Sequence, residues 1–157
     1  MARIHLTTFI AAPIERVFDL TRHLAVYRFL FKSRKEIFSS GAESNLLTKN
    51  ETITILAKHA GKTRMSMLKI TDLDKPVLYT EEQVKGDLQH FRHEHHFKQV
   101  DNGTILIDLI EFGFPRDVIG RLLGKIYLQV YLEEMVRKRN ELIRSYAETE
   151  NWHAVLS

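Results

Sequence analysis

The chain has no cysteine among its 157 residues. That absence excludes disulfide bonds, thiolate metal sites and cysteine nucleophiles, and it is typical of proteins from a reducing compartment. Long apolar runs are missing too, because no run approaches the roughly 20 residues that a membrane span needs. The first residues lack the apolar segment of a signal peptide. We therefore expect a soluble, cytoplasmic protein with no stable insertion into a membrane.

A strong excess of one charge is also lacking. The chain has 23 Lys and Arg against 20 Asp and Glu, a net charge of +3. Two basic clusters, at 32–35 and 137–139, have no interleaved aromatic motif, so we expect solvated surfaces and no nucleic-acid partner. The length is that of one domain, 1–157, and 44% apolar residues suffice for one core. Nothing in the sequence indicates an oligomeric state.

Alternating apolar and polar residues predict a series of β-strands. Turn signals separate them, including Gly61, Gly86-Asp87 and Asn102-Gly103, the last being a strong hairpin signal. Consecutive strands joined by short turns pair as an antiparallel meander. The predicted strands are residues 4–11, 51–59, 63–73, 77–85, 89–100 and 104–114, with a further possible strand at 36–39.

Three helices are predicted around these strands. Pro13 favours the start of a short helix that ends near Leu20. Residues 24–30 suggest a second short helix, although their aromatic side chains also fit a strand or a hydrophobic lid. From Pro115 to about Glu148 an apolar stripe predicts a long helix of about 45 Å. Arg139 interrupts this stripe; it could reach a ligand anion, but we expect it to be a surface residue near the helix end.

This α+β order resembles the START-like (SRPBCC) superfamily, and short motifs strengthen the resemblance. The segment 9–18 resembles the superfamily's first strand and its "A-P-x-x-x-V-F/W" helix start. Residues 59–61, 79–86, 91–97, 103–104 and 108–112 resemble the patterns "H-F-G", "D-E-Q-x-x-G", "F-x-H-E-H-x-F", "G-G-T" and "D-x-x-x-F" of a bacterial ligand-binding subgroup.

The resemblance implies a helix-grip fold of the Bet v type. In that fold a seven-stranded antiparallel sheet wraps around a long C-terminal helix, and two short helices follow the first strand. It also implies a cavity between the sheet and the long helix. The superfamily includes lipid carriers, hormone binders, and polyketide aromatases and cyclases, so the fold alone does not fix a function.

The segment Phe91–Phe97 is the most informative strand. Alternation places Phe91, His93, His95 and Phe97 on one face, with Arg92 and other charged residues on the opposite face. An aromatic face that carries two histidines suits a cavity wall better than a plain core, because buried polar groups need partners.

Pairing the strands about their turns adds further residues to this face. A turn at 86–88 places Glu81 opposite His93 and Tyr79 opposite His95; a hairpin centred on Asn102-Gly103 places Phe97 opposite Asp108. The predicted ligand-binding set is Tyr79, Glu81, Gln83, Phe91, His93, His95, Phe97, Leu106, Asp108 and Phe112, with Met65 and Met67 from a neighbouring strand and Leu128, Tyr131 and Met135 from the long helix.

Four roles are open to His93, His95, Glu81 and Asp108. They could orient a bound ligand, perform acid–base catalysis, hold a metal ion, or form a polar network that only fixes the sheet. Metal ranks last because the pairing supplies no third histidine, so we predict no metal and no cofactor. The preferred prediction is binding of a small hydrophobic or amphiphilic molecule. The alternative is a cofactor-independent cyclase, aromatase or dehydratase that acts on a polyketide-like substrate with a histidine base.

Overall fold

The computed structural model describes residues 1–59, 61–115 and 122–157. Its elements confirm the predicted α+β order, and residues 24–30 lie in a helix. Residues 116–121 of the predicted long helix, and Ala60 of the second motif, lie outside the described residues. The elements are β1 (Ala2–Ile10), α1 (Ile14–Thr21), α2 (Leu24–Ser33), β2 (Ile37–Ser40), β3 (Thr52–His59), β4 (Lys62–Asp74), β5 (Leu78–Lys85), β6 (His90–Val100), β7 (Gly103–Gly113), α3 (Leu122–Ala147), η1 (Glu150–Trp152) and α4 (His153–Leu156).

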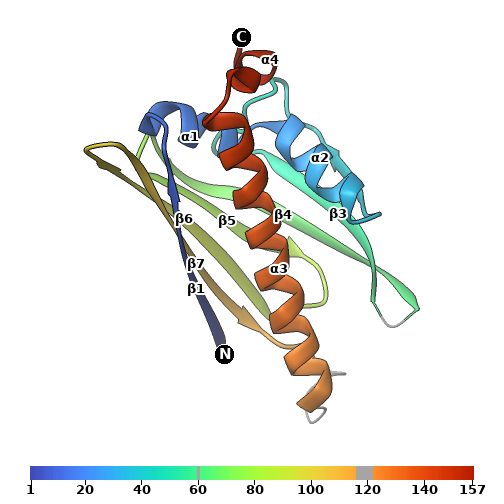
Figure 1. Ribbon diagram of the computed structural model, residues 1–157. Helices are drawn as coiled ribbons and strands as arrows, with labels where there is room; N and C mark the ends of the chain where they lie inside the picture. Colours follow the sequence, from blue (N-terminus) through green and yellow to red (C-terminus); the bar gives the residue numbers. More distant parts are fainter. Residues whose placement is uncertain (60, 116–121) are drawn as a thin grey trace.

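The strands form one seven-stranded antiparallel sheet in the order β1-β7-β6-β5-β4-β3-β2. Helix α3 runs across one face of the sheet, while α1 and α2 lie near its C-terminal end (Figure 1). Leu132, Val136 and Ile143 of α3 are buried in the same core as Ile53 and Ile110 of the sheet. This face is the inner face of the sheet. No helix in the described ranges is long and apolar enough to cross a membrane.

The predicted register is confirmed between β5 and β6 and wrong between β6 and β7. Glu81 lies opposite His93 as predicted, but Phe97 lies opposite Leu106, and Asp108 lies opposite His95. The turn is centred one residue earlier than predicted, because Gly103 already pairs with Val100. A shift of two residues keeps every side chain on its predicted face.

Met65 and Met67 do not share the strand face of the buried Ile53, although Met65 still borders the cavity described below. Met67 lies opposite Thr54 and Met65 opposite Leu56, on the outer face, while Leu68 lies opposite the buried Ile53. The pairing of β4 with β5 shifts between Met67 and Leu68. The inward-facing positions of this half of β4 include polar residues. The apolar methionines therefore suggested the wrong face of the strand.

Candidate functional site

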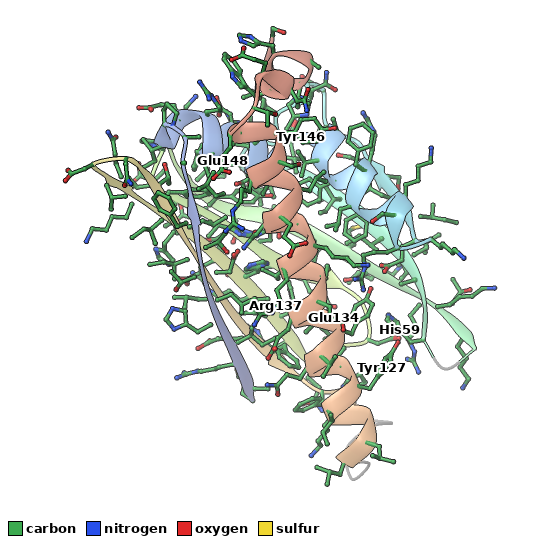
Figure 2. The ribbon with its side chains drawn as sticks, viewed as in Figure 1. His59, Tyr127, Glu134, Arg137, Tyr146 and Glu148 are labelled. Carbon is green, nitrogen blue, oxygen red and sulfur yellow. The ribbon has the colours of Figure 1, made fainter. Side chains whose placement is uncertain are left out.

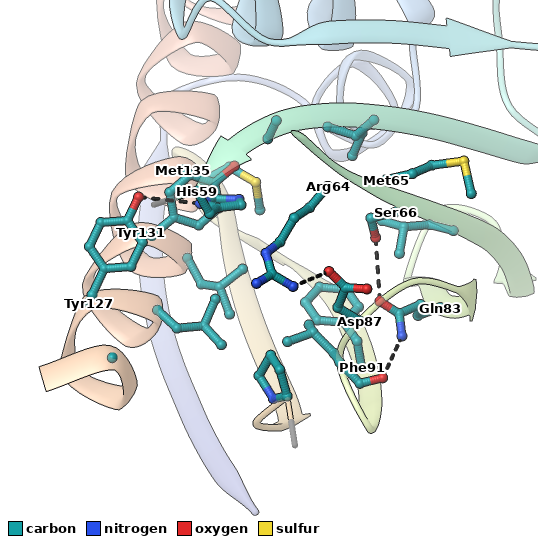
Figure 3. Close-up of a pocket in the computed structure, with 18 of the residues that line it drawn as sticks. His59, Arg64, Met65, Ser66, Gln83, Asp87, Phe91, Tyr127, Tyr131 and Met135 are labelled. Atoms are coloured by element: carbon teal, nitrogen blue, oxygen red, sulfur yellow. Dashed lines mark hydrogen bonds and ion pairs between the residues drawn. The ribbon is translucent and has the colours of Figure 1, made fainter. Parts of the chain in front are cut away.

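A cavity of about 290 Å³ lies between the inner face of the sheet and the N-terminal half of α3 (Figure 3). Its wall is mostly apolar and aromatic, which is the usual composition of a small-molecule site. We call it the large cavity. It is lined by Phe31, Ile55, Ala57, His59, Arg64, Met65, Ser66, Leu68, Gln83, Asp87, Leu88, Phe91, Pro115, Gly124, Tyr127, Leu128, Tyr131, Leu132 and Met135.

A few polar side chains interrupt this wall. Arg64 forms an ion pair with Asp87 at 2.5 Å, and the Asp87 side chain is 46% exposed, so the pair lies where the cavity meets solvent. Deeper in the wall, Gln83 donates to the Leu88 carbonyl oxygen at 2.8 Å. The Ser66 hydroxyl lies 3.5 Å from the Gln83 side-chain oxygen. These groups can offer hydrogen bonds to one end of a ligand.

His59 and two tyrosines of α3 connect the sheet to the helix beside the large cavity. The His59 ring lies 3.3 Å from the Tyr127 hydroxyl (Figure 2) and meets the Tyr131 ring edge-on. Burial lowers the pKa of His59, and the charges of Arg64 and Arg34 lower it further against the opposing effect of nearby carboxylates. The imidazole is therefore neutral at neutral pH.

Beneath the large cavity, Asp108 is surrounded by four donors. Its Oδ1 accepts from His93 Nε2 at 2.9 Å, His95 Nδ1 at 2.8 Å and the Arg139 guanidinium at 2.6 Å. Its Oδ2 accepts from Asn140 at 2.6 Å. All five residues are buried. The predicted surface position of Arg139 is therefore wrong, because the buried carboxylate of Asp108 requires a cation beside it.

Glu81 extends this arrangement toward α2. Its Oε1 accepts a hydrogen bond from the Tyr79 hydroxyl at 2.8 Å and another from the Tyr27 hydroxyl. Its Oε2 lies 3.4 Å from His95 Nε2 and 3.8 Å from His93 Nδ1. We call the connected set the polar network; its members are Tyr27, Tyr79, Glu81, His93, His95, Asp108, Arg139 and Asn140.

The pKa shifts fix the charges in the polar network. Burial alone would raise the pKa of Asp108, but the charge of Arg139 and hydrogen bonds from both imidazoles hold it well below its usual range. Burial also opposes the shift at Glu81, where contacts with His95, His93 and Tyr27 lower the pKa to about 2. Burial, together with His95, lowers the pKa of His93 to about 4. Both carboxylates are ionised at neutral pH, and His93 is neutral.

A second void of about 20 Å³ lies beside the polar network. Its polar wall consists of Tyr27, Glu81, His93 and Arg139, and its volume suits a single water molecule. We call it the small void. Its remaining wall partly coincides with that of the large cavity, since Phe31, Ile55, Leu68, Phe91 and Met135 line both.

The structure therefore divides the predicted site residues into separate groups. Gln83, Leu128, Tyr131 and Met65 border the large cavity, Glu81 and His93 border the small void, and Phe91 and Met135 border both. Tyr79, His95 and Asp108 belong to the polar network. Phe97, Leu106 and Phe112 lie in the apolar core, and Met67 lies on the outer face.

Several residues at these sites were not predicted. Tyr27 was expected only as part of an aromatic segment, and Asn140 gave no signal of its own. The interruption of the α3 stripe by Arg139 was a usable signal, because a charged residue at an apolar position often has a buried partner. His59 was recognised only as part of a motif.

No family model and no curated protein matches the chain. Solved structures do match. TTHA0849 of Thermus thermophilus is 18% identical over 99% of this chain and 100% of its own, with a TM-score of 0.75. The Zhui aromatase/cyclase of Streptomyces sp. R1128 is 16% identical over 94% and 93%, with a TM-score of 0.70. Major latex-like protein 151 of Panax ginseng is 8% identical over 93% and 97%, with a TM-score of 0.65. At these identities the similarity is one of fold.

Proposed function

Because the chain has the helix-grip fold of the START-like superfamily, we propose that its large cavity binds a small apolar or amphiphilic molecule. The observation that carries this proposal is the cavity itself, about 290 Å³ of space with a mostly apolar wall. Protein interiors are close-packed and contain few voids larger than a water molecule. A space of this size beside a well-packed core is therefore expected to have an occupant.

Affinity would come mainly from burial of apolar ligand surface, at about 25 cal/mol per Å². Phe31, Ile55 and Phe91 supply the apolar inner wall, whereas the Arg64–Asp87 ion pair is partly exposed. This polarity favours an amphiphile that inserts its apolar part first and leaves its polar end near Arg64 and Asp87. Gln83 and Ser66 would orient a hydroxyl or carbonyl group along the way.

The cyclase alternative is supported by one contact, since His93 borders the small void. Two observations favour binding instead. Among the residues described, none of His93, His95, Glu81 and Asp108 lines the large cavity. A histidine whose pKa is about 4 is also a weak base at neutral pH. His93→Phe distinguishes the two: a binder keeps its affinity for an apolar probe, whereas an enzyme that uses this base loses turnover.

The test uses a cavity-filling variant. Ala57 is buried and lines the large cavity, so Ala57→Phe places a ring inside it. The matched control is Leu56→Phe, which adds a ring on the outer face of the same strand. Binding is measured by fluorescence of anilinonaphthalene sulfonate and its displacement by dodecanoate and by naringenin. We expect Ala57→Phe to weaken binding by at least about tenfold, or about 1.4 kcal/mol, with no change in the control. Equal binding by both variants would refute the proposal.

A further inference from the structure

The polar network brings together three atoms that could each bind a metal ion, one from each of Glu81, His93 and His95. The ionised Asp108 can only accept hydrogen bonds, so His93 donates to it from Nε2 and His95 from Nδ1. A neutral imidazole that donates from one nitrogen has only a lone pair on the other. Glu81 Oε2 lies 3.8 Å from His93 Nδ1 and 3.4 Å from His95 Nε2, the ring nitrogens that do not face Asp108. Arg139 lies 3.1 Å from His95 Nδ1 and 3.5 Å from His95 Nε2.

The charges of the network lead to the same point. Arg139 contributes one positive charge, while Asp108 and Glu81 contribute two negative charges, and all three side chains are buried. These three side chains together carry one negative charge in excess. An uncompensated buried charge is costly. A cation between these atoms would offset the negative charge of Glu81 and would contact all three atoms.

The spacing of the three acceptors suits a metal ion. One atom from each of Glu81, His93 and His95 lies within 4.8 Å of the others. Ligands of a tetrahedral ion with bonds of about 2.0–2.1 Å lie about 3.3–3.4 Å apart, close to the distances from Glu81 Oε2 to the two imidazoles. The tyrosine hydroxyls occupy Glu81 Oε1, which leaves Oε2 as a single ligand atom.

Asp108 adds the outer partner that such sites use. Imidazole ligands of metals usually donate their remote N–H group to a carboxylate or carbonyl, which fixes the ring and its tautomer. Here one carboxylate holds both imidazoles in this way. The predicted register placed Asp108 on this face but opposite Phe97, two residues from its observed partner His95.

We infer that Glu81, His93 and His95 form a binding site for one divalent transition-metal ion, with Zn²⁺ the best match to two imidazoles and one carboxylate. The small void borders Glu81 and His93 and has room for a water molecule as a further ligand. This inference revises the prediction of no metal. It concerns the polar network, and so it is independent of what the large cavity binds.

The experiment measures Zn²⁺ and Co²⁺ binding to chelator-treated protein by calorimetry and by the visible absorption of bound Co²⁺. We expect one ion per chain. Glu81→Gln should abolish this binding while nearly preserving shape, and Asp108→Asn should weaken it by about 10- to 100-fold. The matched controls are Glu82→Gln and His96→Gln, which change neighbouring residues that project from the opposite face of the same strands; both should bind as the wild type does.

Three results would overturn the inference. The first is that wild-type protein binds neither ion. The second is unchanged binding in Glu81→Gln, which would assign the binding to surface histidines. The third is an imidazole that is protonated on both nitrogens, as observed by nitrogen NMR of labelled histidines, and that keeps both protons when Zn²⁺ is added. A proton would then occupy the position proposed for the metal ion. Wild-type measurements decide the question if Glu81→Gln does not fold. Ala57→Phe should leave Zn²⁺ binding unchanged, so failure here and failure of the proposed function are separable.

Discussion

At the scale of single residues, Arg139 and Asp108 form a buried ion pair in the core. Each charge is buried, and each depends on the other for compensation. We expect Arg139→Met to lower the free energy of unfolding by about 3–5 kcal/mol, because it leaves the Asp108 carboxylate buried without its cation. Urea denaturation measures this loss.

The control for this prediction is Arg137→Met on the same helix. Arg137 is exposed, so its substitution should change the free energy of unfolding by no more than about 0.5 kcal/mol. If the two variants had equal stability, Asp108 would not need Arg139, and the assignment of charges in the polar network would be wrong.

The sequence predicted part of this network and missed the rest for a physical reason. Alternation along β5, β6 and β7 placed Glu81, His93, His95 and Asp108 on one face, and the structure brings them into contact. Arg139 reaches them from α3 across the core. Periodicity within a helix identifies a face but not the partner that this face meets, so the outward assignment of Arg139 was wrong.

At the scale of elements, Gly103 fixes where β7 begins. A Cβ atom at this position would lie 2.4 Å from the Ile10 carbonyl oxygen of β1. Backbone cannot move aside cheaply, so we expect Gly103→Ala to destabilise the protein by about 1–3 kcal/mol. Thermal and urea unfolding test this expectation.

Gly41→Ala is the matched control for Gly103→Ala. No atom lies within 4 Å of a Cβ built at Gly41, and its φ is not positive. The substitution should leave the free energy of unfolding unchanged or raise it by up to about 1 kcal/mol, because alanine lowers the conformational entropy of the unfolded chain. Equal effects at both glycines would mean that β1 does not restrict the start of β7.

Helix α2 has a titratable N-cap. The Nδ1 atom of His23 accepts a hydrogen bond from the Ala25 amide at 3.1 Å, which requires the neutral imidazole. Burial lowers the pKa of His23 below 6.5, and the charges of Arg28 and Arg22 act in the same direction. Asp19 and the Val155 carbonyl oppose the shift but do not cancel it.

This cap predicts a loss of stability in acid. The pKa of His23 is lower in the folded than in the unfolded state. The stability that the neutral His23 cap contributes is therefore present above pH 6.5 and is lost as pH falls toward the folded pKa. We expect His23→Asn, which caps without titrating, to remove this part of the pH dependence. Urea unfolding at neutral and at mildly acidic pH compares the two proteins. Parallel pH profiles would contradict the prediction, because the other histidines titrate in both.

Most elements could be predicted because the sheet buries only one face. That condition produces alternation with period two, and it located the strands within a few residues. The local signals failed where a tertiary contact competed with them. Gly103 serves the approach of β1 and not the centre of the hairpin. In β4 the inner face includes the polar residues Arg64 and Ser66, so the apolar methionines beside them gave the wrong alternation.

At the scale of the whole molecule, the two halves of α3 have different surroundings. The N-terminal half, including Tyr127, Leu128 and Tyr131, faces the large cavity. The C-terminal half, including Arg139 and Ile143, is already buried against the sheet and its neighbours. The volume between helix and sheet depends on how far apart they pack, which no local sequence pattern specifies.

This asymmetry predicts where a ligand acts. A molecule in the large cavity contacts the N-terminal half of α3 together with β3 to β6, so it should slow hydrogen exchange there more than in the C-terminal half. Binding at 100 times Kd adds about 2.7 kcal/mol to global stability, which protects only amides that exchange through global unfolding. Hydrogen exchange with and without dodecanoate separates the two effects. Protection confined to Gly124–Met135 and to the facing strands, and absent in Ala57→Phe, is the expected result. Protection of the same size along all of α3, or its persistence in Ala57→Phe, would mean that the ligand does not occupy the large cavity.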